Sequence, residues 1–106
     1  MPKYAAKVDR NQSEIVDALR KAGCTVAHTH AAGAGFPDIA AGYRGVTYLI
    51  EIKDGLLPPS ARTLTKPQVE WHEAWKGHVC IVTSVEEALL AVGCGVVQMP
   101  MRGKIE

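Results

Sequence analysis

The chain has 106 residues, of which 47% are hydrophobic, and this favours one packed domain spanning residues 1–106 over a disordered chain. Its net charge is +1, from 12 Lys and Arg against 11 Asp and Glu, which argues against a protein that binds nucleic acid through overall positive charge. Any contact with phosphates must therefore come from local charge clusters or from a bound metal ion.

The cysteines and the apolar segments indicate in which cellular compartment the protein is found. Cys24, Cys80 and Cys94 form no CxxC pair and are odd in number, which argues against a disulfide framework. Cys80 and Cys94 lie in apolar runs, so we expect buried free thiols and a reducing, intracellular setting. No apolar signal core follows the N-terminus, and the apolar stretch 88–97 is too short to span a bilayer. These features predict a cytoplasmic protein without a membrane partner.

The first predicted element is a helix that opens at Asn11 and stops at Gly23. Asn11 followed by Glu14 three residues later has the pattern of a capping box. The apolar residues of this segment recur at helical spacing: Ile15, Ala18, Leu19 and Ala22.

Three strands are predicted next, at residues 25–29, 36–41 and 46–53. The last has the clearest alternation, with Ile50 and Ile52 on one face and Glu51 and Lys53 on the other. A short link containing Gly42 and Gly45 indicates that the second and third strands pair antiparallel.

The second half alternates helix and strand. Thr65-Lys66-Pro67-Gln68 predicts the start of a helix that Gly77 ends, and residues 79–82 predict a buried strand. Ser84 and Glu87 predict a capped third helix, and residues 96–99 offer a last edge strand. The order helix, three strands, helix, strand, helix predicts an α/β protein with a central mixed sheet.

The strand pair places acidic residues where a cation can bind. Directly opposed residues of antiparallel strands have side chains about 5 Å apart, so Asp38 and Glu51 can meet. Two such carboxylates repel each other unless a cation lies between them, and oxygen ligands of this kind suit Mg²⁺ or Mn²⁺. The backbone carbonyl of Ile52 could add a ligand. Such an ion would polarise a phosphodiester and acidify a bound water, which Lys53 would orient or help to deprotonate.

These residues resemble a known motif. Pro37-Asp38, followed after a hairpin by Glu51-Ile52-Lys53, resembles the PD-(D/E)XK nuclease motif. The flanking residues 35–39 and 48–55, with the later Gln68-Val69-Glu70-Trp71, are similar to the VRR-NUC branch, which is related to Holliday-junction resolvases. The resemblance runs from about residue 11 to about residue 85. It implies a restriction-endonuclease-like fold with helices on both faces of the sheet and the active site at one edge.

The resemblance also implies roles. Asp38 and Glu51 match the metal-binding acids, Lys53 the catalytic lysine, Glu14 an additional metal-binding acid, and Gln68 the motif glutamine. The implied reaction is Mg²⁺- or Mn²⁺-dependent hydrolysis of DNA phosphodiester bonds, leaving 5′-phosphate and 3′-hydroxyl ends. Branched-DNA relatives act as symmetric pairs, so we expect a homodimer with a preference for branched or junction DNA. The short chain resembles a phage product.

Each site residue has a plainer explanation as well. Glu14 and Gln68 both occupy capping-box positions, and a side chain committed to a backbone N–H is not free for substrate. Asp38 is compatible with an ordinary turn, and Glu51 and Lys53 with the charged face of an exposed strand. The joint occurrence of these residues with the right topology favours the nuclease interpretation.

Two other function classes stay open. One is a non-catalytic nucleic-acid-binding protein that keeps the nuclease fold. The other is a zinc-binding interaction module built on His28, His30 and a cysteine, because the two histidines alternate along a predicted strand. His72 and His78 are expected to be solvated.

The second helix and the basic residues complete the expectations. An aromatic stripe on that helix, expected to be core or dimer interface rather than a platform for bases, consists of Trp71, Ala74 and Trp75. The basic residues that could reach a nucleic-acid backbone are Lys3, Lys7, Arg10, Arg62, Lys66, Arg102 and Lys104.

Overall fold

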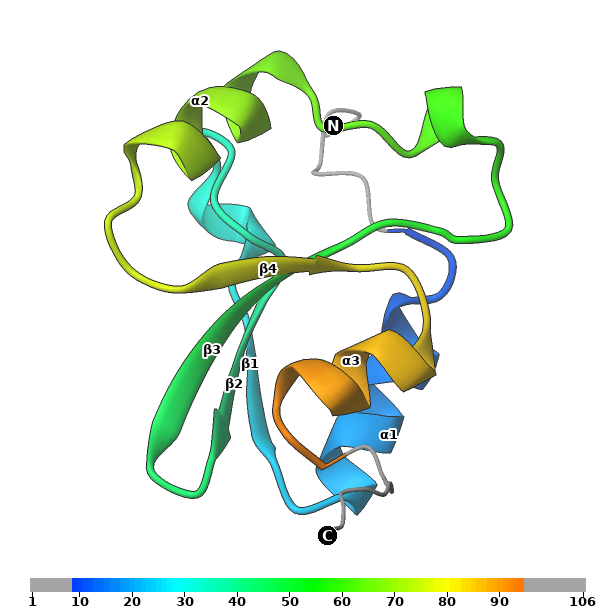
Figure 1. Ribbon diagram of the computed structural model, residues 1–106, viewed down its shortest axis with the longest axis vertical. Helices are drawn as coiled ribbons and strands as arrows, with labels where there is room; N and C mark the ends of the chain where they lie inside the picture. The colour runs from blue at the N-terminus through cyan, green and yellow to red at the C-terminus, as the bar shows by residue number, and fades with distance from the viewer. Residues whose placement is uncertain (1–8, 95–106) are drawn as a thin grey trace, which may run out of the picture.

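The computed structural model describes residues 9–94 (Figure 1). The elements in chain order are α1 (Gln12–Lys21), β1 (Thr25–His28), the 3-10 turn η1 (His30–Ala32), β2 (Ile39–Tyr43), β3 (Val46–Ile52), the 3-10 turn η2 (Pro59–Ala61), α2 (Lys66–Ala74), β4 (Val79–Val82) and α3 (Val85–Ala91). This order of helices and strands confirms the prediction. The edge strand expected at 96–99 lies outside the described residues, as do Lys3, Lys7, Arg102 and Lys104.

The strands form one mixed sheet in the order β1-β2-β3-β4. β1 pairs antiparallel with β2, β2 pairs antiparallel with β3, and β4 runs parallel to β3. The parallel pair requires a crossover, which the 53–78 segment with α2 provides (Figure 1). The mixed sheet of the prediction is therefore confirmed.

The β2–β3 hairpin turns later than the sequence indicates. Gly42 is a strand residue paired with Thr47, and the turn residues are Arg44 and Gly45, at φ 53° and 81°. Positive φ at both central residues is the mark of a two-residue type I′ hairpin. The prediction that Gly42 closes the strand was wrong. A side chain there would meet the Thr25 hydroxyl of β1 at 2.8 Å, which explains a glycine inside the strand.

Two helix ends behave differently from each other. At the end of α1, Gly23 adopts φ 107° and Cys24 N–H donates to Leu19 O, as the glycine predicts. At its start, Asn11 makes no side-chain capping bond. Its amide instead donates to the carbonyls of Lys53, at 3.2 Å, and Thr83, at 3.1 Å. The predicted capping box at α1 was therefore wrong, because Asn11 is buried against the ends of β3 and β4.

The other two helix starts are capped. Thr65 and Gln68 form the predicted capping box of α2. Ser84 accepts the Glu87 N–H of α3 at 3.1 Å, as predicted. The Glu87 carboxylate, however, accepts from Thr83 N–H at 2.7 Å, one residue earlier than a capping box requires.

The core lies between α1, α3 and one face of the sheet (Figure 1). Its buried apolar residues are Ile15, Val16, Leu19, Cys24, Ile39, Ala41, Ile50, Ile52, Val82, Ala88 and Val92. Glu51 and Lys53 alternate with Ile50 and Ile52, so they face the other side of the sheet, where Gln68 of α2 contacts them. Helices therefore flank both faces, but α2 itself buries no residue.

The remaining expectations concern thiols and membranes. All three cysteines are free, with Cys24 buried and Cys80 and Cys94 half-buried at the edge of the core. Within residues 9–94 no helix has both the length and the apolar character needed to cross a bilayer.

Candidate active site

Two carboxylates meet at the end of the β2–β3 hairpin. The register pairs Ile39 with Ile50, so the next residues outward, Asp38 and Glu51, lie opposite each other. Asp38 is 8% exposed and Glu51 is 1% exposed. The Ile52 N–H donates to Asp38 Oδ2 at 2.7 Å and fixes that carboxylate against β3. The hairpin thus forces two acids together in a site that excludes most water.

Glu51 is the more perturbed of the two acids. Burial, and then the nearby charge of Asp38, raise the pKa of Glu51 to about 8, while Lys53 acts in the opposite direction. Its Oε1 is buried and has no hydrogen-bond partner among the described residues. A buried carboxylate oxygen without a donor is costly. A cation bound between the two acids would satisfy this oxygen and, by stabilising the charged carboxylate, lower the pKa of Glu51 again.

Lys53 and Gln68 hold the other oxygen of Glu51. Gln68 Nε2 donates to Glu51 Oε2 at 2.9 Å, and Lys53 Nζ lies 3.8 Å from the same oxygen. Lys53 Nζ donates to Gln68 Oε1 at 2.8 Å. The ammonium of Lys53, with 11% of its side chain exposed, is therefore locked beside the carboxylates. It is placed to contact an anionic group that enters the site.

Gln68 caps α2 and also contacts Lys53 and Glu51. Its Oε1 accepts Thr65 N–H at 2.9 Å as well as the Lys53 ammonium. Capping therefore does not take Gln68 out of contact with Lys53 and Glu51. An amide oxygen has two lone pairs, and the NH₂ group at the other side of the carbon remains free to donate to Glu51.

The first turn of α2 packs closely against the glycine loop, which comprises residues 33–35. A side chain on Gly35, at φ 83°, would lie 2.2 Å from Pro67 O. Only glycine allows this approach. On the far side of the loop, Thr29 N–H and His30 N–H both donate to Asp38 O, at 2.8 and 3.1 Å. The chain between β1 and β2 therefore contacts Asp38 through the backbone of Thr29 and His30, and contacts the helix that carries Gln68 through Gly35.

These groups line a cleft of about 870 Å³. One wall is the glycine loop with the first turn of α2, and the other is the segment between β3 and η2 with the residues that follow it. The lining residues are Asp9, Arg10, His30, Gly33, Ala34, Gly35, Phe36, Asp38, Glu51, Lys53, Asp54, Leu56, Leu57, Ala61, Thr63, Thr65, Pro67 and Gln68. Asp38, Glu51, Lys53 and Gln68 are thus brought together in one cleft.

The structure does not bring Glu14 to this cleft. Glu14 is exposed and lines a neighbouring hollow with Thr83 and Glu86, which shares Arg10, Asp54 and Leu56 with the cleft. The reason is helical geometry: Ile15 and Leu19 form the buried face of α1, and Glu14 projects away from it. As for Ile52, its N–H faces Asp38, and its carbonyl points to the same side because both groups of a strand residue do. Its role as a ligand stays a prediction.

Asp9 is the acidic residue near α1 that lies at the cleft. It lines the same cavity as Glu51, and its charge adds to the rise in the Glu51 pKa. Its carbonyl accepts the N–H of Gln12, the first residue of α1. Asp9 was not predicted as a site residue because it lies before the segment whose apolar residues recur at helical spacing. The only local signal is its place one turn before the buried Gln12.

The histidines do not form a zinc site. β1 ends at His28, whose Nδ1 lies 3.3 Å from Gln12 Nε2, and His30 belongs to η1. The prediction that the two histidines share a strand face was therefore wrong. Within residues 9–94, which contain His28, His30 and all three cysteines, no group of three or more His, Cys, Asp or Glu side chains could hold a metal. A cation at Asp38 and Glu51 would therefore complete its shell with water or backbone oxygens, which is the habit of Mg²⁺.

Of two predictions about α2, the one for His72 was wrong. His72 is half-buried rather than solvated, and burial followed by the nearby Lys53 charge lowers its pKa. Trp71 packs on Phe36, with ring centroids 5.1 Å apart, and stacks on Trp75 at 4.8 Å. Trp75 remains 40% exposed, so the aromatic stripe is not core. Whether it joins two copies of the chain stays a prediction.

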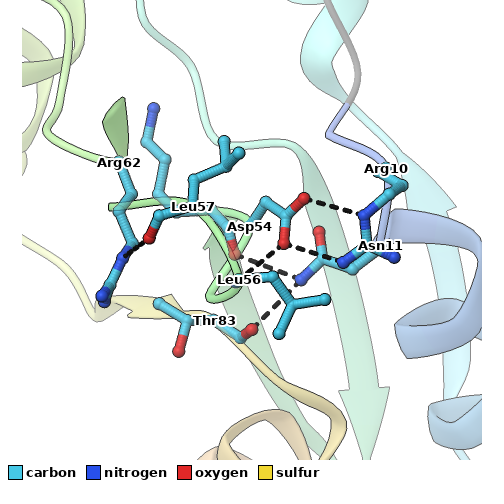
Figure 2. A network of polar contacts seen from close by, with 8 residues as sticks. Arg10, Asn11, Asp54, Leu56, Leu57, Arg62 and Thr83 are labelled. Atoms are coloured by element: carbon cyan, nitrogen blue, oxygen red, sulfur yellow. Dashed lines mark hydrogen bonds and ion pairs between the residues drawn. The ribbon is translucent and has the colours of Figure 1, made fainter. Parts of the chain in front are cut away.

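A polar network fixes the segment that follows β3 (Figure 2). Arg10 donates to both carboxylate oxygens of Asp54, each at 2.9 Å. This pairing lowers the pKa of Asp54 and raises that of Arg10. Beside it, the Asn11 amide reaches the Lys53 and Thr83 carbonyls (Figure 2). The network therefore ties the start of α1 to the chain directly after Lys53, and sequence analysis did not find it.

A comparison with solved structures supports this fold. The chain is similar to a solved structure described as a VRR_NUC domain, with 24% sequence identity and a TM-score of 0.57. The match covers 76% of this chain and 90% of that one. No family model matches the chain, and no curated protein does. The likeness confirms the expected VRR-NUC type of α/β fold.

Proposed function

We propose that this protein is a nuclease that hydrolyses DNA phosphodiester bonds with Mg²⁺ or Mn²⁺. The observation that carries the proposal is the buried acid pair, in which Asp38 and Glu51 face each other and Glu51 Oε1 lacks a partner. Lys53 and Gln68 complete the arrangement at one end of the cleft. The similarity in fold to a VRR_NUC domain supports the same conclusion.

The residues fit a divalent cation. Asp38, Glu51 and the Ile52 carbonyl are the groups that would hold it, and all offer the oxygen ligands that Mg²⁺ and Mn²⁺ prefer. When bound, the cation polarises the phosphodiester and lowers the pKa of a water molecule. Asp38 is already oriented by the Ile52 N–H, so little reorganisation is needed on binding.

The chain's own residues supply the rest of the chemistry. Lys53 is positioned to orient the attacking water and to offset the negative charge that builds on the phosphorus oxygens. Gln68 holds the Lys53 ammonium and Glu51 at fixed positions through the two ends of one amide. Because Gln68 is also tied to Thr65 N–H, the position of α2 and the position of Lys53 are coupled.

The finer features of the function follow from charge and size. The net charge of +1 suits specialised DNA structures better than tight nonspecific binding to duplex DNA. One small domain covers little DNA, so we propose a homodimer that acts on branched or junction DNA in an intracellular setting, such as that of a phage-encoded protein. Free thiols at all three cysteines are consistent with a reducing compartment.

The test is a cleavage assay on labelled linear, flap and junction DNA with Mg²⁺, Mn²⁺ or EDTA. Cleavage should require the metal and should disappear in Glu51→Ala and Lys53→Ala. Glu86→Ala and Lys76→Ala change exposed residues of the same types outside the cleft and should cleave like the wild type. Retained cleavage in both site variants would refute the site, and DNA binding without any cleavage would favour a non-catalytic binding protein.

A further inference from the structure

The wall of the cleft opposite α2 carries two exposed leucines. Leu56 is 83% exposed and Leu57 is 39% exposed, and both line the cleft that contains Asp38, Glu51 and Lys53. Single exposed apolar residues are common on proteins and need no explanation by themselves. What distinguishes this pair is its position beside the acids and the way its backbone is held.

The backbone of the leucine pair is fixed on both sides (Figure 2). Leu56 N–H donates to Asp54 Oδ1 at 3.0 Å, and Leu57 N–H donates to Asp54 O at 3.1 Å. Asp54 is itself held by two nitrogens of the Arg10 side chain, Nε and Nη2. On the other side, Arg62 Nε donates to Leu57 O at 2.7 Å. Leu56 is therefore presented outward by an ordered backbone.

The charges of the cleft make a second argument. Four of its lining residues are acids, Asp9, Asp38, Glu51 and Asp54, whereas the two lining cations are Arg10 and Lys53. Arg10 is already paired with Asp54, and Lys53 with Gln68 and Glu51. Without a bound cation, the side-chain charges of the cleft therefore attract phosphates only weakly, even at the point where the DNA strand would be cut. Contact with the uncharged bases would supply what the charges do not.

The volume of the cleft limits what it admits. About 870 Å³ is within the range of about 300–1,000 Å³ that is typical of small-molecule pockets. A few nucleotides of one strand match a site of this size, and a strand whose bases are already unpaired enters it more easily than a strand of a continuous duplex. Leucine is among the side chains that proteins insert between base steps to unstack them.

We propose, on the basis of the proposed nuclease function, that Leu56 and Leu57 form a wedge that contacts bases next to the scissile phosphate. The wedge separates one strand from its partner and guides it to Asp38 and Glu51. The favoured substrates are therefore DNA structures with unpaired or easily unstacked nucleotides at the cleavage position, because opening them costs least. Leu56 acts on substrate position and takes no part in the chemical step.

The experiment measures base unstacking separately from cleavage. Flap DNA carries the fluorescent base 2-aminopurine beside the cleavage position mapped with the wild-type protein and Mn²⁺. Binding is then followed with Ca²⁺ in place of Mn²⁺, and unstacking raises the fluorescence. The variants are Leu56→Ala, Leu56→Met, and Leu90→Ala as a matched control, since Leu90 is 64% exposed on α3, outside the cleft.

Leu56→Ala should lose most of the fluorescence rise and reduce kcat/KM on flap DNA by about tenfold, equivalent to about 1.4 kcal/mol. The loss should be smaller on single-stranded DNA, which needs no opening. Leu56→Met should restore the signal, and Leu90→Ala should match the wild type. A full fluorescence rise and unchanged flap cleavage in Leu56→Ala would overturn the wedge alone. A wild-type protein that cleaves no DNA with Mn²⁺ would overturn the proposed function and the wedge with it.

Discussion

The helices α1 and α2 begin with the same sequence pattern and use it differently. Asn11 and Glu14 open α1, and Thr65 and Gln68 open α2, each pair with capping-box spacing. At α2 the box forms, and Gln68 also contacts Lys53 and Glu51. At α1 no side-chain cap forms, and Glu14 is exposed away from the cleft.

The difference arises from how each helix packs. α1 buries one face against the sheet, and that face includes Gln12, Ile15 and Leu19 but not Glu14. α2 buries no residue and touches the site through its first turn. A capping residue can therefore double as a site residue only when the first turn itself lies over the site. The pattern alone does not say which helix meets that condition.

The largest expected effect in this comparison is that of Gln68→Ala on catalysis. The change removes the donor to Glu51 Oε2 and the acceptor for Lys53 Nζ. We expect cleavage to slow about 100-fold, as when one preorganised donor is removed from an active site. Steady-state kinetics on flap DNA would measure it, and a loss of less than threefold would show that Gln68 is only a cap.

Thr65→Ala provides the matched control for Gln68→Ala. It removes the hydroxyl that accepts Gln68 N–H but leaves the amide contacts to Glu51 and Lys53 in place. It should cost about 1 kcal/mol of stability, like other N-cap losses, with much less effect on the cleavage rate. If both variants lose the same activity, the effect of Gln68→Ala belongs to helix capping.

A second prediction concerns Asn11 and the stability of the fold. Asn11→Ala leaves the carbonyls of Lys53 and Thr83 without their side-chain donor, which should lower the free energy of unfolding by about 2 kcal/mol. Chemical denaturation would measure this loss. Asn11→Asp decides its cause, because aspartate is as good an N-cap as asparagine but cannot donate to carbonyls. Full stability in Asn11→Asp would restore the capping explanation.

The parts of the fold that the sequence predicted correctly depend on short-range rules. Gly23 ends α1, Thr65 and Ser84 begin helices, and the alternation of β3 places Glu51 opposite the core. The hairpin was misjudged because glycine is allowed in a turn but does not specify one. Whether Gly42 or Gly45 turns the chain depended on the register with β1, where the Thr25 hydroxyl needs the space.

The site divides in the same way. Asp38, Glu51 and Lys53 could be placed together because a hairpin brings nearby residues into register. The Arg10–Asp54 pair joins residues 44 positions apart, and Asn11 reaches Lys53 across 42. No local pattern identifies such partners, since they depend on where α1 docks. Asp9 was missed for the same reason, as its relation to Glu51 exists only after docking.

A third prediction concerns Glu51, the acid that Gln68 contacts and that Glu14 does not reach. Because the pKa of Glu51 is raised to about 8, the metal-free protein holds a proton there that the unfolded chain releases near its ordinary pKa of 4.5. The folded state then binds more protons, so its stability should fall as pH rises from about 4.5 to about 8.

Mn²⁺ must displace that proton, so its affinity should weaken up to tenfold for each pH unit below about 8. Calorimetric titration at several pH values measures both proton release and affinity. Glu51→Gln should remove the pH dependence of stability, and an Mn²⁺ affinity that is constant between pH 6 and 8 would contradict the prediction.

The smallest expected effect is that of Glu14→Gln, and it tests the comparison most directly. Because Glu14 is exposed and does not line the cleft, its neutralisation should change the cleavage rate less than twofold. Asp9→Asn is the matched change at the cleft and should weaken Mn²⁺ binding several-fold, because Asp9 contributes negative potential at Glu51. Mn²⁺ titrations of the two variants side by side separate them. If Glu14→Gln loses metal affinity and Asp9→Asn does not, α1 must turn or shift when the metal binds, and its first turn then serves the site as that of α2 does.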